Sequence, residues 1–212
     1  MGKARVLVAD DHTLVAHAFK NLLEPNYEVV GTVSDGRALL RVAHETKPDI
    51  VILDLGMPLL NGADAGQELK RVMPHIKILV VTMNEDYELA AYALKHWAAG
   101  FLLKKSAGSE LAKAIHEILA GKRYVTPKVA QRLLDEFVRD PRPYHAKQLT
   151  IRQREVLQLL AEGRTMKEVS GILNVSARTV AFHKYRIMEE FSLKTNSDLI
   201  KLAIREHIIN PP

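Results

Sequence analysis

Five polar residues in the first half of the chain follow or end short apolar runs. They are three carboxylates, a hydroxyl and an amine: Asp10, Asp11, Asp54, Thr82 and Lys104. Clustered carboxylates repel one another unless a cation neutralises them, and carboxylate oxygens suit Mg²⁺. A carboxylate can also act as a nucleophile and form an aspartyl phosphate, whose oxygens a lysine and a hydroxyl can bind. These residue types therefore indicate a cation-dependent carboxylate site, provided that the fold brings them together.

The apolar runs before these residues have the composition of buried strands. They are short, rich in β-branched residues and separated by stretches with helical spacing, which is typical of βαβ units. The runs are Arg5–Ala9, Glu28–Val33, Ile50–Leu53, Ile78–Thr82 and Phe101–Leu103, and the helical stretches are Thr13–Leu23, Arg37–Thr46, Ala63–Met73, Tyr87–His96 and Glu110–Ala120. The pattern predicts a doubly wound α/β fold with a five-stranded parallel sheet. Such sheets bind ligands beyond the carboxyl ends of their strands, where all five polar residues fall.

The second half has no comparable strands and predicts a small all-α domain of four helices. Capping boxes, N-caps and left-handed turn residues mark the expected helix ends. These signals are the pairs Thr150–Gln153 and Thr195–Asp198, the helix-ending Gly163, the turn residue Asn174 and the N-cap Ser176. Between the two halves, Lys128–Val138 has helical spacing, and Arg139–Tyr144 contains two prolines and reads as a linker.

Two of the expected helices, Thr165–Leu173 and Ser176–Phe191, are separated by a tight turn and fit a helix-turn-helix motif. Basic, small and aromatic residues remain on the outer face of the second helix, where they can reach phosphates and base edges in a major groove. This outer face carries Arg178, Ala181, Phe182, Lys184 and Tyr185, with Arg186 near its edge. Ordinary packing of three helices with a charged outer face gives the same pattern, so the spacing leaves both interpretations open.

The net charge of +5 lies entirely in the second half. Residues 1–125 contain 15 basic and 15 acidic residues, whereas residues 126–212 contain 15 basic and 10 acidic residues. A basic half suits phosphate backbones or an anionic membrane surface. The chain has no cysteine, which excludes disulfides and thiolate chemistry, and no apolar run approaches the length that a bilayer requires. We expect a cytoplasmic protein without a signal peptide and without a membrane partner.

The first half resembles the CheY-like receiver domain of two-component response regulators. The resemblance spans about residues 3–122, and its motifs are Val8-Ala9-Asp10-Asp11-His12, Leu53-Asp54-Leu55-Gly56-Met57-Pro58 with Asn61-Gly62, Val81-Thr82-Met83 and Gly100-Phe101-Leu102-Leu103-Lys104. It implies a site whose parts have separate roles. The implied phosphoacceptor is Asp54, and the implied ligands of Mg²⁺ are Asp10, Asp11, Asp54 and the Gly56 carbonyl. The resemblance further implies that Thr82 and Lys104 hold the phosphoryl group. Phe101 is the implied switch aromatic, the ring whose packing changes on phosphorylation.

Three residues depart from the common receiver pattern. Phe101 stands where many relatives have Tyr, so any switching there depends on packing alone. Lys105 stands where relatives often have Asp, and we expect a solvated surface lysine. Trp97, the only tryptophan, stands where Gly is common. It is either an interface anchor or a side chain packed on its own domain, and we favour the latter.

Residues 149–208 resemble the LuxR-type (NarL/FixJ) DNA-binding domain. The motifs are Leu149–Leu157, Ala161-Glu162-Gly163, Lys167-Glu168-Val169, Leu173-Asn174-Val175-Ser176 and Arg178-Thr179-Val180 with His183. The resemblance implies phosphate contacts from Lys167 and Thr179, a dimerising final helix and a recognition helix from Ser176 to Arg186. Its implied DNA-binding residues are Lys167, Ser176, Arg178, Thr179, Ala181, Phe182, Lys184, Tyr185 and Arg186.

The outer face of the recognition helix, which would contact the bases, differs from that of many relatives. Ala181, Phe182 and Tyr185 stand where those relatives have basic, branched or polar residues. Fewer cations then face the bases, so apolar contacts carry more of the readout. For His183 we favour a buried or phosphate-facing role over that of a pH sensor.

Together these features predict a receiver domain (1–124), a connecting helix and linker (125–148) and a helix-turn-helix domain (149–212). The predicted function is a transcriptional response regulator that a sensor histidine kinase phosphorylates on Asp54 and that binds double-stranded DNA as a homodimer. One alternative is an interaction module without phosphorylation-dependent DNA binding. An aspartyl-phosphate phosphohydrolase is disfavoured, because Gly56 occupies the position where such enzymes carry a second acid.

Overall fold

The computed structural model describes residues 2–139 and 149–209. Contacts divide the chain into two units, one of residues 1–57 and 62–145 and the other of residues 58–61 and 146–212. Residues 140–144 of the predicted linker lie outside the described part of the chain, and Arg139 is the last residue of a helix. The division into domains at 124 and 148 therefore stays a prediction.

The first unit is built on a parallel sheet, as its alternating pattern predicts. The strands are β1 (Arg5–Ala9), β2 (Glu28–Val33), β3 (Ile50–Leu53), β4 (Lys77–Thr82), β5 (Gly100–Leu103) and β6 (Tyr124–Val125), in the order β2-β1-β3-β4-β5-β6. Because β2 and β3 pair with opposite edges of β1, the winding direction reverses there. Such a reversal creates the crevice in which doubly wound sheets bind ligands.

The prediction of five strands was one short. The missing strand, β6, has only two residues and pairs with β5 at the edge of the sheet. A run of two residues shows no periodicity of its own, so the pattern could not reveal it. Its position is set by long-range hydrogen bonds, including one from the Thr126 backbone N–H to the Phe101 carbonyl of 2.9 Å.

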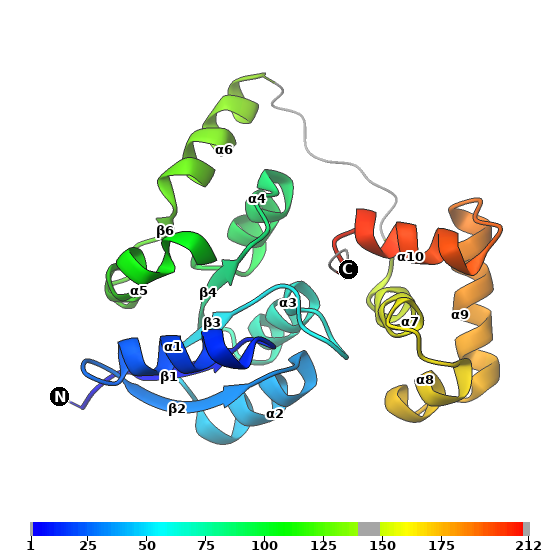
Figure 1. The fold of residues 1–212 in the computed structure, drawn as a ribbon, viewed down its shortest axis with the longest axis horizontal. Coiled ribbons are helices and arrows are strands. Elements are labelled where there is room, and N and C mark those ends of the chain that lie inside the picture. The colour runs from blue at the N-terminus through cyan, green and yellow to red at the C-terminus, as the bar shows by residue number, and fades with distance from the viewer. Residues whose placement is uncertain (1, 140–148, 210–212) are drawn as a thin grey trace. The chain divides into compact units, whose positions relative to one another are not determined.

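Helices cover both faces of the sheet (Figure 1). They are α1 (Thr13–Leu23), α2 (Gly36–Thr46), α3 (Gly62–Val72), α4 (Tyr87–His96) and α5 (Lys104–Leu119), followed by α6 (Pro127–Arg139). Phe19 of α1 and Leu111 of α5 share one buried cluster with strand residues that include Val8. None of the helices within 2–139 and 149–209 has the length and apolar content that crossing a bilayer demands.

Helix α5 begins at Lys104, earlier than the predicted start at Glu110. Its first turn contains Lys104, Lys105 and Ser106 and lacks large apolar residues, so the periodic pattern becomes visible only further along the helix. Ala107 and Leu111 are nevertheless both buried, at the i, i+4 spacing that places them on one face. Lys104 is therefore the first residue of a helix rather than the end of a strand.

Trp97 packs inside its own unit, as we favoured from the sequence. Its side chain is only 4% exposed. A Cβ placed on Gly66 of α3 would lie 2.6 Å from ring atom Cζ3 of Trp97 and 2.9 Å from Leu53 Cδ2. Gly66 thus provides the space that the indole fills.

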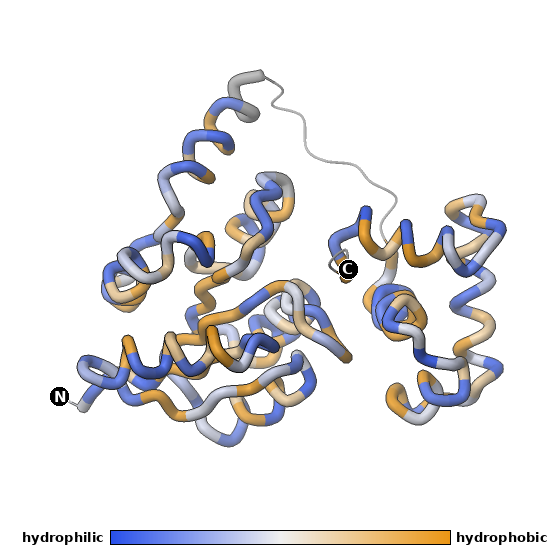
Figure 2. Tube along the Cα trace, in the orientation of Figure 1, coloured by the Kyte–Doolittle hydropathy of each residue, from blue (hydrophilic) through white to orange (hydrophobic). Residues whose placement is uncertain are grey.

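The second unit contains the four predicted helices, α7 (Ile151–Ala161), α8 (Met166–Leu173), α9 (Ala177–Glu190) and α10 (Asn196–Arg205). The predicted capping boxes at Thr150–Gln153 and Thr195–Asp198 are present, and a third links Thr165 to Glu168. Asn174 adopts the left-handed conformation, with φ of 52°, between α8 and α9. Hydrophobic and hydrophilic residues alternate along these helices (Figure 2), and the hydrophobic ones form two buried clusters.

Candidate functional sites

The fold gathers the predicted carboxylates at the carboxyl edge of the sheet. Asp10 and Asp11 follow β1, and Asp54 follows the neighbouring strand β3. Ligand atoms of Asp10, Asp11, His12 and Asp54 lie within 4.8 Å of one another. Backbone contacts fix this edge, because the Asp54 N–H donates to the Ala9 carbonyl over 2.9 Å.

Lys104 joins two of these carboxylates. Its Nζ lies 2.8 Å from Asp10 Oδ2 and 2.8 Å from Asp54 Oδ2, and all three side chains are buried. Burial raises the pKa of Asp10, although hydrogen bonds from Lys104 and the His12 backbone oppose the change. Burial also tends to lower the pKa of Lys104, but hydrogen bonds to Asp10 and Asp54 outweigh it, so the net pKa is raised. The site is a charge-paired cluster with its ammonium held in place.

Thr82 and Gly56 lie at the same edge of the sheet, at the end of β4 and after β3 respectively. Thr82 is the buried last residue of β4, and its Oγ1 accepts a hydrogen bond of 3.1 Å from the Asn84 N–H. Gly56 lies in the loop between Asp54 and α3. Gly62 begins α3 so close to the site strand that a Cβ there would lie 1.9 Å from the Asp54 carbonyl oxygen. This position therefore requires glycine, which the sequence motif did not explain.

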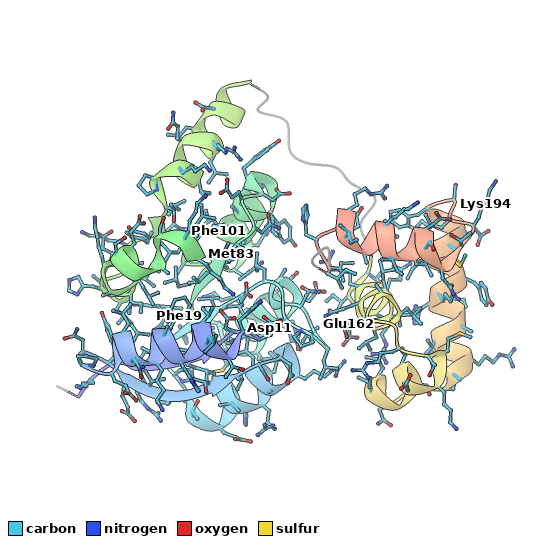
Figure 3. All side chains as sticks on the ribbon, viewed as in Figure 1. Asp11, Phe19, Met83, Phe101, Glu162 and Lys194 are labelled. Carbon is cyan, nitrogen blue, oxygen red and sulfur yellow. The ribbon has the colours of Figure 1, made fainter. Side chains whose placement is uncertain are left out.

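Phe101 is fully buried on β5 (Figure 3). Its strand neighbour Leu102 belongs to the cluster formed with α1 and α5. Because successive strand residues point to opposite faces, Phe101 points to the other face of the sheet. The predicted switch aromatic is thus on the same face of the sheet as Thr82 and, because Phe has no hydroxyl, it can act only through packing.

The sequence analysis did not assign a role to His12. It is the N-cap residue of α1, and its Nδ1 lies 2.8 Å from Asp11 Oδ1 and 3.4 Å from Asp10 Oδ1. The His12 backbone N–H also donates to Asp10 Oδ1 over 2.9 Å. His12 therefore holds Asp10 through its backbone N–H and places its imidazole beside both carboxylates.

A second ionic group adjoins the site through Glu85, which follows β4. Glu85 pairs with Lys105 at the start of α5 and with Lys128 of α6, the latter over 2.7 Å. Hydrogen bonds from both lysines lower the pKa of Glu85 to about 2. Lys105 is half-exposed, as expected of a surface lysine, but its ammonium is paired with Glu85.

The donor set of the carboxylate cluster fits a hard divalent cation. Its described ligand atoms are mostly carboxylate oxygens, which Mg²⁺ prefers. The Lys104 ammonium neutralises only part of the charge of three aspartates. A divalent cation would balance the remainder.

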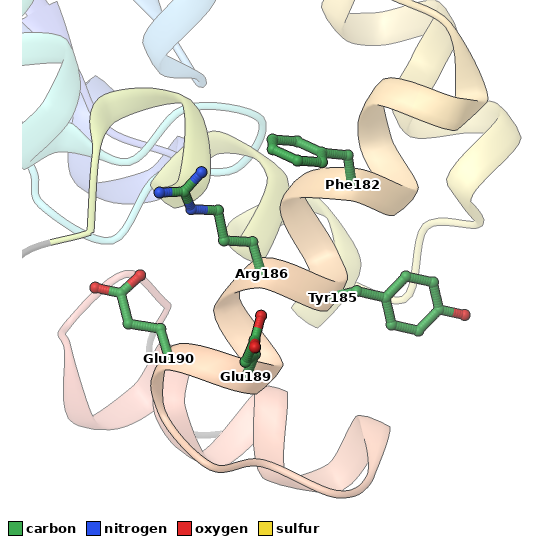
Figure 4. A pocket seen from close by; sticks show the side chains of 5 residues that line it. All are labelled: Phe182, Tyr185, Arg186, Glu189 and Glu190. Carbon is green, nitrogen blue, oxygen red and sulfur yellow. The ribbon is translucent and has the colours of Figure 1, made fainter.

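The predicted recognition surface lies on α9. Phe182 and Tyr185 are 57% and 60% exposed, and Arg178 and Arg186 are also exposed. Ala181 and Lys184 are half-buried. Phe182, Tyr185 and Arg186 also line a shallow hollow of about 660 Å³ together with Glu189 and Glu190 (Figure 4).

The predicted phosphate-contacting residues lie near the starts of α8 and α9. Lys167 is exposed in the first turn of α8. Ser176 caps α9 by accepting a hydrogen bond of 3.1 Å from the Thr179 N–H. Burial lowers the pKa of His183, and Arg152 and Arg186 add to this effect, which favours the neutral imidazole.

Two protein families match the chain. The model described as the response regulator receiver domain matches residues 6–116, and the model of bacterial regulatory proteins of the luxR family matches residues 147–203. Response regulator GacA of Pseudomonas aeruginosa is 32% identical over 209 residues, covering 97% of this chain and 98% of the relative. Oxygen regulatory protein NreC of Staphylococcus epidermidis is 33% identical over 215 residues, covering 97% and 99%.

A solved structure of RcsB from Salmonella enterica serovar Typhimurium is also similar. It contains RcsB bound to promoter P1flhDC in the presence of the phosphomimetic BeF3⁻. Its TM-score is 0.60 at 28% identity, covering 94% of this chain and 97% of RcsB. The order of elements, the carboxylate cluster and these similarities agree: the chain belongs to the DNA-binding transcriptional response regulators that join a receiver domain to a LuxR-type helix-turn-helix domain.

Proposed function

We propose that Asp54 accepts a phosphoryl group from a sensor histidine kinase and that this modification controls DNA binding. An Asp54 carboxylate oxygen attacks phosphorus, the bond from phosphorus to the kinase histidine breaks, and its electron pair returns to the imidazole. The observation that carries the proposal is the position of Lys104, whose ammonium lies 2.8 Å from oxygens of both Asp10 and Asp54. The same ammonium can bind a phosphoryl oxygen on Asp54.

Mg²⁺ would be held by Asp10, Asp11, Asp54 and the Gly56 carbonyl. The cation supplies positive charge that offsets the charge of the phosphoryl oxygens. The buried Thr82 hydroxyl, at the end of the strand beside β5, would donate to a phosphoryl oxygen. Giving up its present contact with the Asn84 N–H would move the loop after β4, and Phe101 would repack in response.

In the second unit, Lys167, Ser176, Arg178 and Thr179 would contact phosphates. Ala181, Phe182, Lys184, Tyr185 and Arg186 would face the base edges, as recognition helices do in the major groove. A homodimer would bind paired half-sites, with α10 contributing to its interface. We place the protein in the cytoplasm, because both proposed partners, the kinase and the DNA, are accessible there.

The test is light scattering of the full chain with Mg²⁺, with and without beryllofluoride, followed by DNA binding on the same samples. We expect beryllofluoride to convert monomer to dimer and to tighten DNA binding, and Asp54→Ala to abolish both effects. Lys122→Gln, which replaces an exposed lysine in the turn after α5, is the matched control that keeps them. A DNA affinity that neither beryllofluoride nor Asp54→Ala changes contradicts the proposed control of DNA binding by phosphorylation. A DNA affinity independent of salt favours an interaction module instead.

A further inference from the structure

We propose that Phe182 and Tyr185 read thymine methyl groups, so that the DNA half-site is specified mainly by apolar contacts. The inference rests on the proposed placement of α9 in the major groove and adds the class of base that it recognises. Each base pair presents a distinct pattern in that groove, and thymine alone among the four bases presents a C5-methyl group there.

The first observation is the exposure of two large rings at helical spacing. Phe182 and Tyr185 are three residues apart on α9, so they lie on the same side of the helix, and more than half of each side chain is exposed. Both line the hollow in Figure 4. Exposed aromatic surface is costly in water, and contact with methyl groups of bases would remove part of that cost.

The second observation is the position of the cations on this helix. The Arg186 guanidinium carbon lies 5.9 Å from the centroid of the Phe182 ring, and Lys184 Nζ lies 5.7 Å from that of Tyr185. A cation over an aromatic ring is attracted to its face. Bidentate recognition of guanine needs a basic side chain that extends to the base edge. Ala181, the residue beside Phe182, is too short to provide one.

The third observation is the acidic end of the same surface. Glu189 and Glu190 line the hollow together with the rings, and Glu190 is held by a hydrogen bond of 3.3 Å from Gln153 Nε2. Carboxylates repel DNA phosphates, so they keep the last turn of α9 away from the backbone. Phe182 and Tyr185 lie in the middle turns of α9, on the N-terminal side of these carboxylates, so the part of the helix that enters the groove includes the two rings and excludes the last turn.

The experiment begins with selection of bound duplexes from a random library, using the full chain with Mg²⁺ and beryllofluoride. Each thymine in the selected half-site is then replaced by uracil, which removes only the methyl group. We expect the replacement to weaken binding about fourfold at each contacted thymine, the change that corresponds to exposing one methyl group. A 5-methylcytosine offered at the same position, opposite guanine, should bind more tightly than cytosine.

Variants connect this effect to the two rings. Phe182→Ala and Tyr185→Ala should each bind thymine and uracil sites equally at one position, whereas Phe182→Leu keeps part of the discrimination and shows that the helix is intact. Arg178→Ala is the matched control and should weaken both sites by the same factor. Two results overturn this inference alone: tight binding whose affinity does not change when uracil replaces thymine at any position, and a half-site in which the selected bases are guanines rather than thymines. A library from which no duplex is enriched overturns the proposed DNA binding and the inference with it.

Discussion

Gly66 and Trp97 form a complementary pair on α3 and at the end of α4. A Cβ on residue 66 would lie 2.6 Å from Cζ3 and 2.9 Å from Cε3 of the indole. The indole Nε1 is buried without a hydrogen-bond partner, so the site holds the ring by packing rather than by a polar contact. A large residue and a glycine from different helices thus depend on each other.

This dependence predicts a strong coupling between substitutions at the two positions. Gly66→Ala should destabilise the protein by about 1–3 kcal/mol through overpacking, and Trp97→Ala by about 3–5 kcal/mol through the cavity that it leaves. In the Trp97→Ala background, Gly66→Ala should cost at least about 1 kcal/mol less, because only the close approach to the Leu53 side chain remains. Urea unfolding of the unmodified chain, the two single variants and the double variant measures this coupling as a double-mutant cycle. Additive effects would show that the two residues do not share this space.

Lys104→Gln should destabilise the protein in the absence of Mg²⁺ and make its stability depend on the cation. The substitution leaves Asp10 and Asp54 buried without their ammonium partner, a loss of about 3 kcal/mol or more. It also raises the pKa of Asp10 further, because one of the contacts that oppose the effect of burial is lost. Thermal unfolding with and without Mg²⁺ should show a larger stabilisation by the cation than in the unmodified chain. Lys105→Gln is the control, and an equal response of both variants to Mg²⁺ contradicts the prediction.

The capping box of α8 should make the stability of the second unit sensitive to acid. Glu168 accepts hydrogen bonds from the Thr165 N–H and hydroxyl, both over 2.8 Å, and these lower the pKa of Glu168. A carboxyl with a lowered pKa in the folded state stabilises fully above its ordinary value of 4.5, and the contribution disappears as the pH falls through the lowered value. Glu168→Gln keeps the cap but does not titrate there. The difference in unfolding midpoint between the two proteins should shrink as the pH falls below 4.5 and through the lowered pKa of Glu168, and a constant difference would exclude the carboxylate as the cause.

Lys167→Ala should weaken DNA binding by a similar factor on every sequence. Lys167 is exposed near the start of α8, where the proposed contact is to a phosphate. The slope of log affinity against log salt should fall by about 1 for this single contact. Lys122→Ala, which removes an exposed lysine after α5 in the first unit, provides the comparison and should leave the slope unchanged. A change of base preference in Lys167→Ala would instead assign this lysine to base recognition.

The sequence predicted those features that depend on neighbouring residues. The capping boxes at Thr150 and Thr195, the left-handed Asn174 and the strands that end at the carboxylates follow from local propensity and periodicity. The clustering of Asp10, Asp11 and Asp54 was also predictable, because the carboxyl ends of parallel strands share one edge.

The remaining features depend on contacts between residues far apart in the chain. The strand β6 is too short to have a period, and the early start of α5 lacks large apolar residues. The bridge from Lys105 and Lys128 to Glu85 joins three elements through exposed charges, and ordinary surface charges show the same composition. The place of the Trp97 indole required knowledge of Gly66 on another helix.

Thr126 ties the start of the connecting helix α6 to the end of β5, so movements at that edge of the sheet would tilt the helix. The Thr126 hydroxyl accepts a hydrogen bond of 3.1 Å from the Leu103 N–H, next to Lys104, and the Thr126 carbonyl accepts from the N–H groups of Val129 and Ala130 in α6. Glu85, on the loop after Thr82, holds Lys128 in the same turn. Helix α6 is about 20 Å long, and these contacts hold its first turn next to Lys104, which belongs to the proposed phosphoacceptor site. A tilt of about ten degrees about its first turn would displace the C-terminal end of α6 by about 3 Å. A small movement of the loop after β4 would therefore become a larger displacement at Arg139.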